Sequence, residues 1–201
     1  FDPEIFSGSG IEKVNITKDV SEITGPFRDL KKLKTIEISE KNELFQYLNN
    51  EIFIGKKNKN GKTFSILYFI PDDVEKVIIP SYIKRIYPLS VSKKKRLKEV
   101  LFEENSQLET IEEESFSQCE LAGINIPDST RQICERAFSM CWNLETVSIS
   151  KNSMLSSIGN NSFECSHITS IYIPSQVTQI GRFAFSNCKN LTSMEFSENS
   201  R

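Results

Sequence analysis

Short alternations of apolar and polar residues recur along the chain at a nearly constant spacing. Each has two apolar residues separated by one other residue, as in Val147-Ser148-Ile149. Residues two positions apart lie on one face of an extended strand, so each alternation predicts a short strand with one buried face. The last apolar residue of the alternation recurs about every 23 residues, apart from one longer interval. The residues at this position are Ile16, Ile38, Ile79, Phe102, Ile126, Ile149, Ile173 and Phe196.

A second apolar pattern lies between these alternations. An isoleucine is followed five residues later by a phenylalanine, and a cysteine comes after the phenylalanine. One unit of this length cannot bury its apolar residues alone, whereas stacked units share a continuous core with one parallel strand each. We expect the cysteines to form a buried series of thiols in the turns, with Cys165 one position out of register. The three series are Ile111, Ile133, Ile158 and Ile180; Phe116, Phe138, Phe163 and Phe185; and Cys119, Cys141, Cys165 and Cys188.

The repeated unit resembles a known repeat family. Residues 173–196 read IPSQVTQIGRFAFSNCKNLTSMEF, which is similar to the pattern I-P-x-x-V-x-x-I-G-x-x-A-F-x-x-C-x-x-L of BspA-like leucine-rich repeats. The similarity recurs over almost the whole chain. It departs from the pattern at three places. Val91 replaces the phenylalanine, Pro26-Phe27 replaces Ala-Phe, and Cys134 replaces the glycine.

The resemblance implies a leucine-rich-repeat solenoid with a horseshoe-like α/β architecture. Short parallel strands should line one side, and turns or short helical segments should line the other. We expect residues 1–201 to form a single domain of about seven to eight units, each about 23 residues long. The last unit has no recognisable capping sequence, so we expect the chain to be a piece of a longer array.

The longer interval, between Ile38 and Ile79, predicts an insertion. Two apolar segments flank Asn60-Gly61, a dipeptide typical of tight hairpin turns. We therefore predict an inserted β-hairpin over residues 49–70, similar to inserts in BspA-like proteins. Its tip is a candidate basic loop, which is either a solvated turn or a recognition element. The basic residues of this loop are Lys56, Lys57, Lys59 and Lys62.

Charge and composition exclude several classes of function. The 201 residues carry 25 Lys and Arg against 27 Asp and Glu, so the net charge of −2 gives no argument for nucleic acid as a partner. No apolar run approaches the roughly 18 residues of a membrane span, so we expect no direct membrane insertion. The densest basic cluster, residues 92–98, is either a solvated turn or a patch for a polyanion.

No catalytic or metal-binding arrangement emerges from the sequence. The five cysteines form no C-x-x-C pair, and the single histidine, His167, has no zinc-like spacing to them. Cys165 lies near His167, but we expect it to belong to the turn series rather than to act as a nucleophile. The run Glu112-Glu113-Glu114 is expected to be a solvated loop. We expect no enzyme activity, no metal and no cofactor; Asn15, Asn160 and Asn190 begin glycosylation triplets that matter only in a secreted chain.

The most promising surface is the outward face of the predicted strands. Residues between the buried apolar positions point away from the core. Ile78 and Leu101 are apolar neighbours in this column, and such a patch is typical of a partner site, although scattered exposed apolar residues are common. The candidate partner-binding face comprises Glu37, Ile78, Leu101, Asn125, Ser148, Tyr172 and Glu195.

Two functions are consistent with these features. The resemblance implies a non-enzymatic cell-adhesion or protein-interaction scaffold, at the cell surface or secreted, that binds an extracellular-matrix, host or other cell-surface protein. The alternative is a cytoplasmic leucine-rich-repeat scaffold or regulator that binds one protein partner. The odd number of cysteines and the lack of a visible signal segment favour this alternative.

Overall fold

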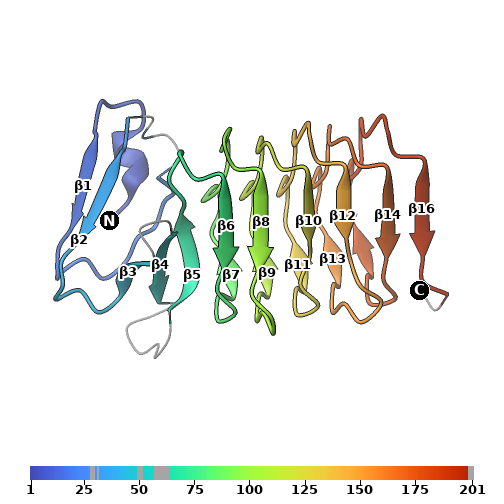
Figure 1. The fold of residues 1–201 in the computed structure, drawn as a ribbon, viewed down its shortest axis with the longest axis horizontal. Coiled ribbons are helices and arrows are strands. Elements are labelled where there is room, and N and C mark those ends of the chain that lie inside the picture. The colour runs from blue at the N-terminus through green and yellow to red at the C-terminus, as the bar shows by residue number, and fades with distance from the viewer. Residues whose placement is uncertain (28–29, 31, 49–51, 57–63, 199–201) are drawn as a thin grey trace.

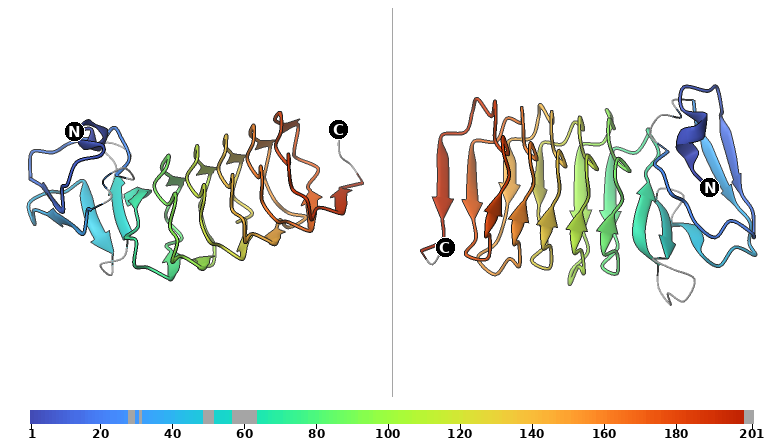
Figure 2. Two further views of the ribbon diagram at one scale, coloured as in Figure 1. Left: turned by 90° about the horizontal axis from the view of Figure 1, so that it is seen from above. Right: turned by 180° about the vertical axis from the view of Figure 1, so that it is seen from behind.

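The computed structural model describes residues 1–27, 30, 32–48, 52–56 and 64–198. The chain coils into an elongated solenoid with its termini at opposite ends (Figure 1). Two columns of parallel strands form opposite sides of the coil (Figure 2). This architecture confirms the leucine-rich-repeat solenoid expected from the sequence.

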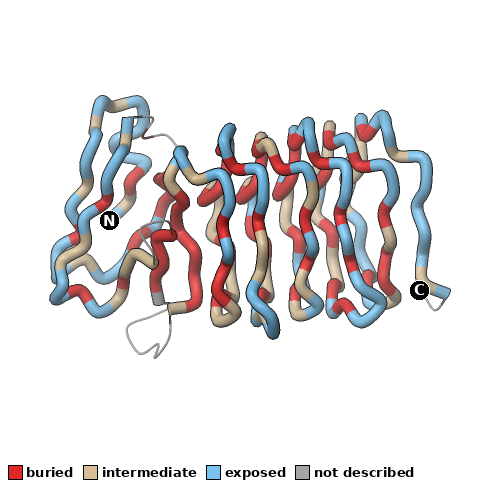
Figure 3. The backbone as a smooth tube through the Cα atoms, in the orientation of Figure 1, coloured by how far each residue is buried: buried red, intermediate tan, exposed pale blue. Residues whose placement is uncertain are grey.

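The first strand column contains the apolar alternations of the sequence. Its strands form three parallel sheets. β1 pairs with β2, β6 pairs with β8, and the third sheet has the order β10, β12, β14, β16. Buried and more exposed residues alternate along β6, β12 and β14, as Figure 3 shows, whereas the last two residues of β8 are both half-buried. The strands are β1 (Lys13–Ile16), β2 (Thr35–Ile38), β6 (Lys76–Ile79), β8 (Glu99–Phe102), β10 (Gly123–Asn125), β12 (Thr146–Ser148), β14 (Ser170–Ile173) and β16 (Ser193–Phe196).

A second strand column lies on the opposite side of the coil, where the sequence predicted turns or short helical segments. Each two-residue strand of this column ends in the isoleucine of the second apolar pattern. Among the described residues the helical structure is a single 3-10 turn, η1 (Pro3–Phe6). The column comprises β5 (Phe64–Phe69), β7 (Arg85–Ile86), β9 (Thr110–Ile111), β11 (Gln132–Ile133), β13 (Ser157–Ile158) and β15 (Gln179–Ile180).

Tight turns that bond to one another follow the second column and take the place of helices. The amide of Phe138 donates to the carbonyl of Ser162 at 2.7 Å, and the amide of Phe163 donates to the carbonyl of Ala184 at 2.8 Å. The backbone amides of each tight turn thus form their hydrogen bonds with the tight turn of the next repeat, rather than within a helix. Two residues per turn have positive φ, for example Arg136 (50°) and Met140 (57°).

The predicted insertion is a β-hairpin that gains a third strand. β4 (Ile52–Lys56) pairs antiparallel with β5, and β3 (Phe45–Leu48) pairs antiparallel with β4. The sequence pattern did not indicate β3. In the candidate basic loop, Lys57, Lys59 and Lys62 lie outside the described residues, and for Lys56 only the backbone at the end of β4 is described.

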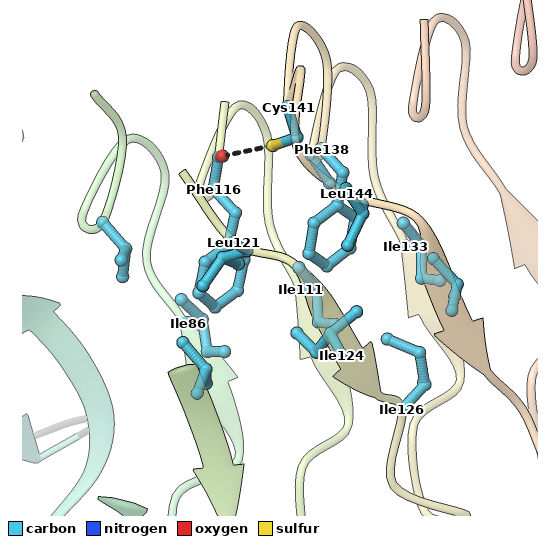
Figure 4. Packing of buried hydrophobic residues seen from close by; sticks show 14 of the residues in the cluster. Ile86, Ile111, Phe116, Leu121, Ile124, Ile126, Ile133, Phe138, Cys141 and Leu144 are labelled. Atoms are coloured by element: carbon cyan, nitrogen blue, oxygen red, sulfur yellow. Dashed lines mark hydrogen bonds between the residues drawn. The ribbon is translucent and has the colours of Figure 1, made fainter. Parts of the chain in front are cut away.

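The core is built from rows of identical side chains. The rings of Phe116, Phe138, Phe163 and Phe185 stack nearly parallel, with centroids 5.2, 5.3 and 5.5 Å apart. Isoleucine and leucine rows fill the space between the two strand columns (Figure 4). A second cluster, around Phe27 and Phe53, joins the N-terminal strands to the hairpin. Because every unit buries its apolar row against its neighbours, stability is shared along the coil.

Candidate partner-binding face

All seven candidate residues lie on the outward face of the first strand column. Glu37, Ile78, Asn125, Ser148 and Glu195 are exposed, whereas Leu101 and Tyr172 are half-buried. The strand register aligns them, because Ile78 pairs with Leu101, Asn125 with Ser148, and Tyr172 with Glu195. Glu37 pairs with Asn15 on the separate β1–β2 sheet. The residues therefore share one side of the coil but lie on three separate sheets.

An apolar pair lies near the middle of this face. Ile78 is 51% exposed although its neighbours Val77 and Ile79 are buried. Beside it on the same face, Lys76 and Glu99 form an ion pair at 2.8 Å. Exposed ion pairs of this kind contribute little to stability, so their charges remain available to a partner. The face thus presents an apolar centre with a charged margin, which is the composition of many protein interfaces.

A cavity lies beside the apolar pair, between β8 and β10. Its volume is about 420 Å³, and its lining includes Leu101 and Asn125 of the candidate face. Glu103 and Asp128, in the turns after these strands, also line it. Reasoning from the strand alternation missed these turn residues, because it considered only positions inside the strands.

The basic cluster at residues 92–98 is largely neutralised by neighbouring units. Lys94 is buried, pairs with Asp72 and lies 4.5 Å from the centroid of the Phe69 ring. Arg96 pairs with Glu75 at 2.6 Å. Hydrogen bonding to Arg96 lowers the pKa of the Glu75 carboxyl. Lys94 is thus a structural residue where the hairpin meets the repeats, and less free charge remains for a polyanion than the sequence indicated.

Three cysteines form the expected buried series, but Cys165 does not. The thiols of Cys119, Cys141 and Cys188 donate to backbone carbonyls one repeat earlier, at 2.9 to 3.1 Å (Figure 4 shows that of Cys141). Ser166, fully buried, takes the place expected for Cys165, and its Oγ lies 3.3 Å from the Cys188 Sγ. Cys165 lies one residue earlier, half-buried, at a position with φ of 59°. The offset of one position seen in the sequence is therefore real, and the expectation that Cys165 joins the buried thiols was wrong.

The thiols of this series are poorly suited to nucleophilic chemistry. Burial raises the pKa of Cys119 to about 12 and raises that of Cys141 well above its ordinary value. The thiolate, which is the reactive form, is correspondingly disfavoured. His167 is exposed with its ring edge-on to Trp142 at 6.4 Å, and no hydrogen bond joins it to Cys165 in the described structure.

The glutamate run also differs from expectation. Glu112 is buried, and its carboxylate accepts a hydrogen bond from Nε of Arg85 in the preceding unit. Glu113 is exposed and Glu114 is half-buried. The run is therefore not a uniformly solvated loop, because Glu112 completes a salt bridge between two units.

Metal-binding groups and membrane-spanning helices are both absent from the described part of the chain. It contains no group of three or more His, Cys, Asp or Glu residues placed to hold a metal ion. None of its helices has the length and apolar character needed to cross a membrane.

The chain is similar to several solved repeat proteins. It matches a leucine rich cell surface protein from Faecalibacterium prausnitzii A2-165 with a TM-score of 0.80 and 25% identity, over 98% of this chain and 50% of that one. A leucine-rich repeat protein from Bacteroides ovatus ATCC 8483 matches with a TM-score of 0.59 and 26% identity, over 75% of this chain and 41% of that one. The pneumococcal vaccine antigen PcpA shares the fold, with a TM-score of 0.61 and 23% identity over 94% of this chain and 41% of its own.

The chain thus spans about half the length of the first of these proteins. No curated protein matches its sequence. The sequence model of the BspA type leucine rich repeat region matches residues 1–74 and 67–192, with 6 copies. Together with the repeated strands, stacked phenylalanines and thiol series, this match shows that the chain belongs to the BspA-type leucine-rich repeat family.

Proposed function

We propose that the chain is a cell-surface scaffold that binds a protein partner through the outward face of the first strand column. The observation that carries this proposal is an apolar pair, the exposed Ile78 and the half-buried Leu101, aligned in register on β6 and β8. A solenoid offers an extended rigid face, so a partner can be bound without the cost of ordering the site. The description of the Faecalibacterium protein as a cell surface protein supports the location.

The breadth and composition of this face support the proposed partner class. An extracellular-matrix, host or other cell-surface protein provides a surface broad enough to cover several strands. The rest of the face is polar or charged, with Asn125, Ser148 and Glu195 exposed along it. Interfaces commonly combine such a polar margin with a few apolar residues that contribute most of the binding energy. We therefore place the adhesion role on Ile78 and Leu101, with Tyr172 as a secondary contact.

A double substitution tests this proposal. Ile78→Glu together with Leu101→Glu places charge on the apolar centre, and we expect binding to a panel of immobilised matrix and cell-surface proteins to weaken at least tenfold, about 1.4 kcal/mol. Surface plasmon resonance measures the affinity. Met154→Glu is the matched control, because Met154 is also 51% exposed but lies outside the outward column. Undiminished binding by the double variant would move the partner site to another surface.

One observation favours the alternative location, the cytoplasm. All five cysteines are free thiols, which is typical of proteins in reducing compartments. The two locations differ in a direct experiment, since a surface protein is cleaved when intact cells are treated with protease. Protection of the full-length protein in intact cells would support a cytoplasmic scaffold that binds one protein partner.

A further inference from the structure

The first strand column is interrupted beside the apolar pair. β8 pairs with β6, and β10 pairs with β12, but no strand pairing joins β8 to β10 in the described structure. The two strands still run side by side (Figure 1). The cavity of about 420 Å³ lies at this interruption. It is therefore a hollow in the proposed partner-binding face itself, and we call it the β8–β10 cavity.

Two carboxylates that line the β8–β10 cavity, those of Glu103 and Asp128, are bonded to neutral groups in the described structure. Glu103 accepts a hydrogen bond from the backbone amide of Ser81 at 2.8 Å, and Asp128 accepts one from the hydroxyl of Ser150 at 2.7 Å. Both donors are neutral, and each bond uses one oxygen of the carboxylate. Among the described residues, neither carboxylate forms an ion pair. By contrast, Glu99 at the start of β8 is paired with Lys76.

The remaining lining of the β8–β10 cavity is uncharged, and consists of apolar surface, amides and the side chains of Ser106 and Ser129. Leu101, Phe102, Ile126 and Pro127 supply apolar surface, and Asn125 supplies an amide. A ligand that fits must carry positive charge at one end and an aliphatic stem along its length. Amino-acid side chains with this design are those of arginine and lysine. Arginine fits better, because its planar group presents five N–H donors and can bond two carboxylates and an amide oxygen at once.

We propose that the β8–β10 cavity receives an arginine side chain of the protein partner. This inference rests on the proposed function and names a chemical feature of the partner. The guanidinium binds the free carboxylate oxygens of Glu103 and Asp128, and its methylene groups lie along Leu101 and Phe102. Because both carboxylates already hold a neutral donor, they are oriented before the partner arrives, which lowers the entropy cost of binding.

A small-molecule titration tests the cavity without the partner. N-acetyl-arginine amide is added to the ¹⁵N-labelled chain, and backbone amide shifts are followed by NMR. We expect saturable shifts confined to residues around Leu101, Asn125 and Asp128, and about tenfold weaker binding by Asp128→Asn. Asparagine can still accept the Ser150 hydrogen bond, so this variant should fold normally. Glu145→Gln is the matched control, since Glu145 is exposed and lies at the opposite end of the repeat.

The neutral analogue N-acetyl-citrulline amide separates charge recognition from general apolar binding. Equal affinity for citrulline and arginine would overturn the proposal, as would unchanged arginine binding by Asp128→Asn. Equal affinity for N-acetyl-lysine amide would overturn the choice of arginine. These outcomes differ from failure of the proposed function. The proposed function fails if the Ile78 and Leu101 double variant still binds its partner with undiminished affinity.

Discussion

Buried hydroxyl groups occupy some positions where other repeats carry alanine. Ser115 and Ser162 are fully buried, and neither side-chain oxygen has a hydrogen-bond partner in the described structure. The equivalent residues of other units are Ala137 and Ala184, which are also buried. A buried polar group without a partner costs roughly 1–3 kcal/mol, so the alanine units avoid a penalty that the serine units carry.

Replacing one of these serines should therefore stabilise the chain. We expect Ser162→Ala to raise the free energy of unfolding by about 1 kcal/mol, because it removes the unpaired hydroxyl and leaves no cavity larger than one atom. Urea unfolding followed by circular dichroism measures the change. Ser117→Ala is the control, because the Ser117 hydroxyl donates to the Ser139 carbonyl at 3.2 Å and its loss should be destabilising. A destabilised Ser162→Ala variant would show that its hydroxyl is hydrogen-bonded in solution.

The tight turn is the element in which sequence and conformation disagree most. Met140 has a φ of 57° and Gln118 a φ of 60°, although neither residue type favours the left-handed region. Asn187, at the equivalent position of a later unit, does favour it. The turn tolerates these residues because hydrogen bonds to the next turn fix its backbone. For example, the Met140 amide donates to the Glu164 carbonyl at 2.7 Å.

Glycine should relieve this local strain. We expect Met140→Gly to raise the free energy of unfolding by up to about 1 kcal/mol, because glycine adopts positive φ without a steric penalty. The neighbouring substitution Ser139→Gly is the control, since Ser139 does not have positive φ. Glycine there adds entropy to the unfolded chain and removes a buried side chain, so it should be destabilising. Thermal unfolding of the two variants gives the comparison. Equal destabilisation by both would show that the left-handed turn stores little strain.

The turns also mark the limit of what the sequence could predict. Period-two alternation located the first strand column and its outward residues, because burial of Val147 and Ile149 requires that pattern. The second column could not be found this way, since strands of two residues such as β11 carry no periodicity. Cys165 was wrongly assigned to the buried thiols, because it follows Phe163 by two residues whereas the other cysteines of the series follow their phenylalanines by three. Ser166 therefore reaches the thiol series in its place. The β8–β10 cavity depends on strand pairing between units, which a pattern within one unit does not encode.

At the scale of the whole molecule, the stacked phenylalanines form one continuous row. The ring of Phe138 has a stacked neighbour on each side, at 5.2 and 5.3 Å. Within the described structure, the ring of Phe185 stacks on Phe163 alone and is half-buried. In a solenoid, stability is roughly a sum of units and their interfaces, so an internal ring should support two interfaces and a terminal ring one.

Removing these two rings should therefore have unequal effects. We expect Phe138→Ala to lower the free energy of unfolding by about 3–5 kcal/mol, as is usual for a buried phenylalanine, and Phe185→Ala to cost less than half as much. Hydrogen exchange should also differ, because the loss of Phe138 opens a boundary inside the coil whereas the loss of Phe185 frays only the units beside β15 and β16. Urea unfolding and exchange mass spectrometry measure the two effects. Similar losses in both variants would mean that the chain unfolds as one cooperative block, in which coupling along the row outweighs the individual interfaces.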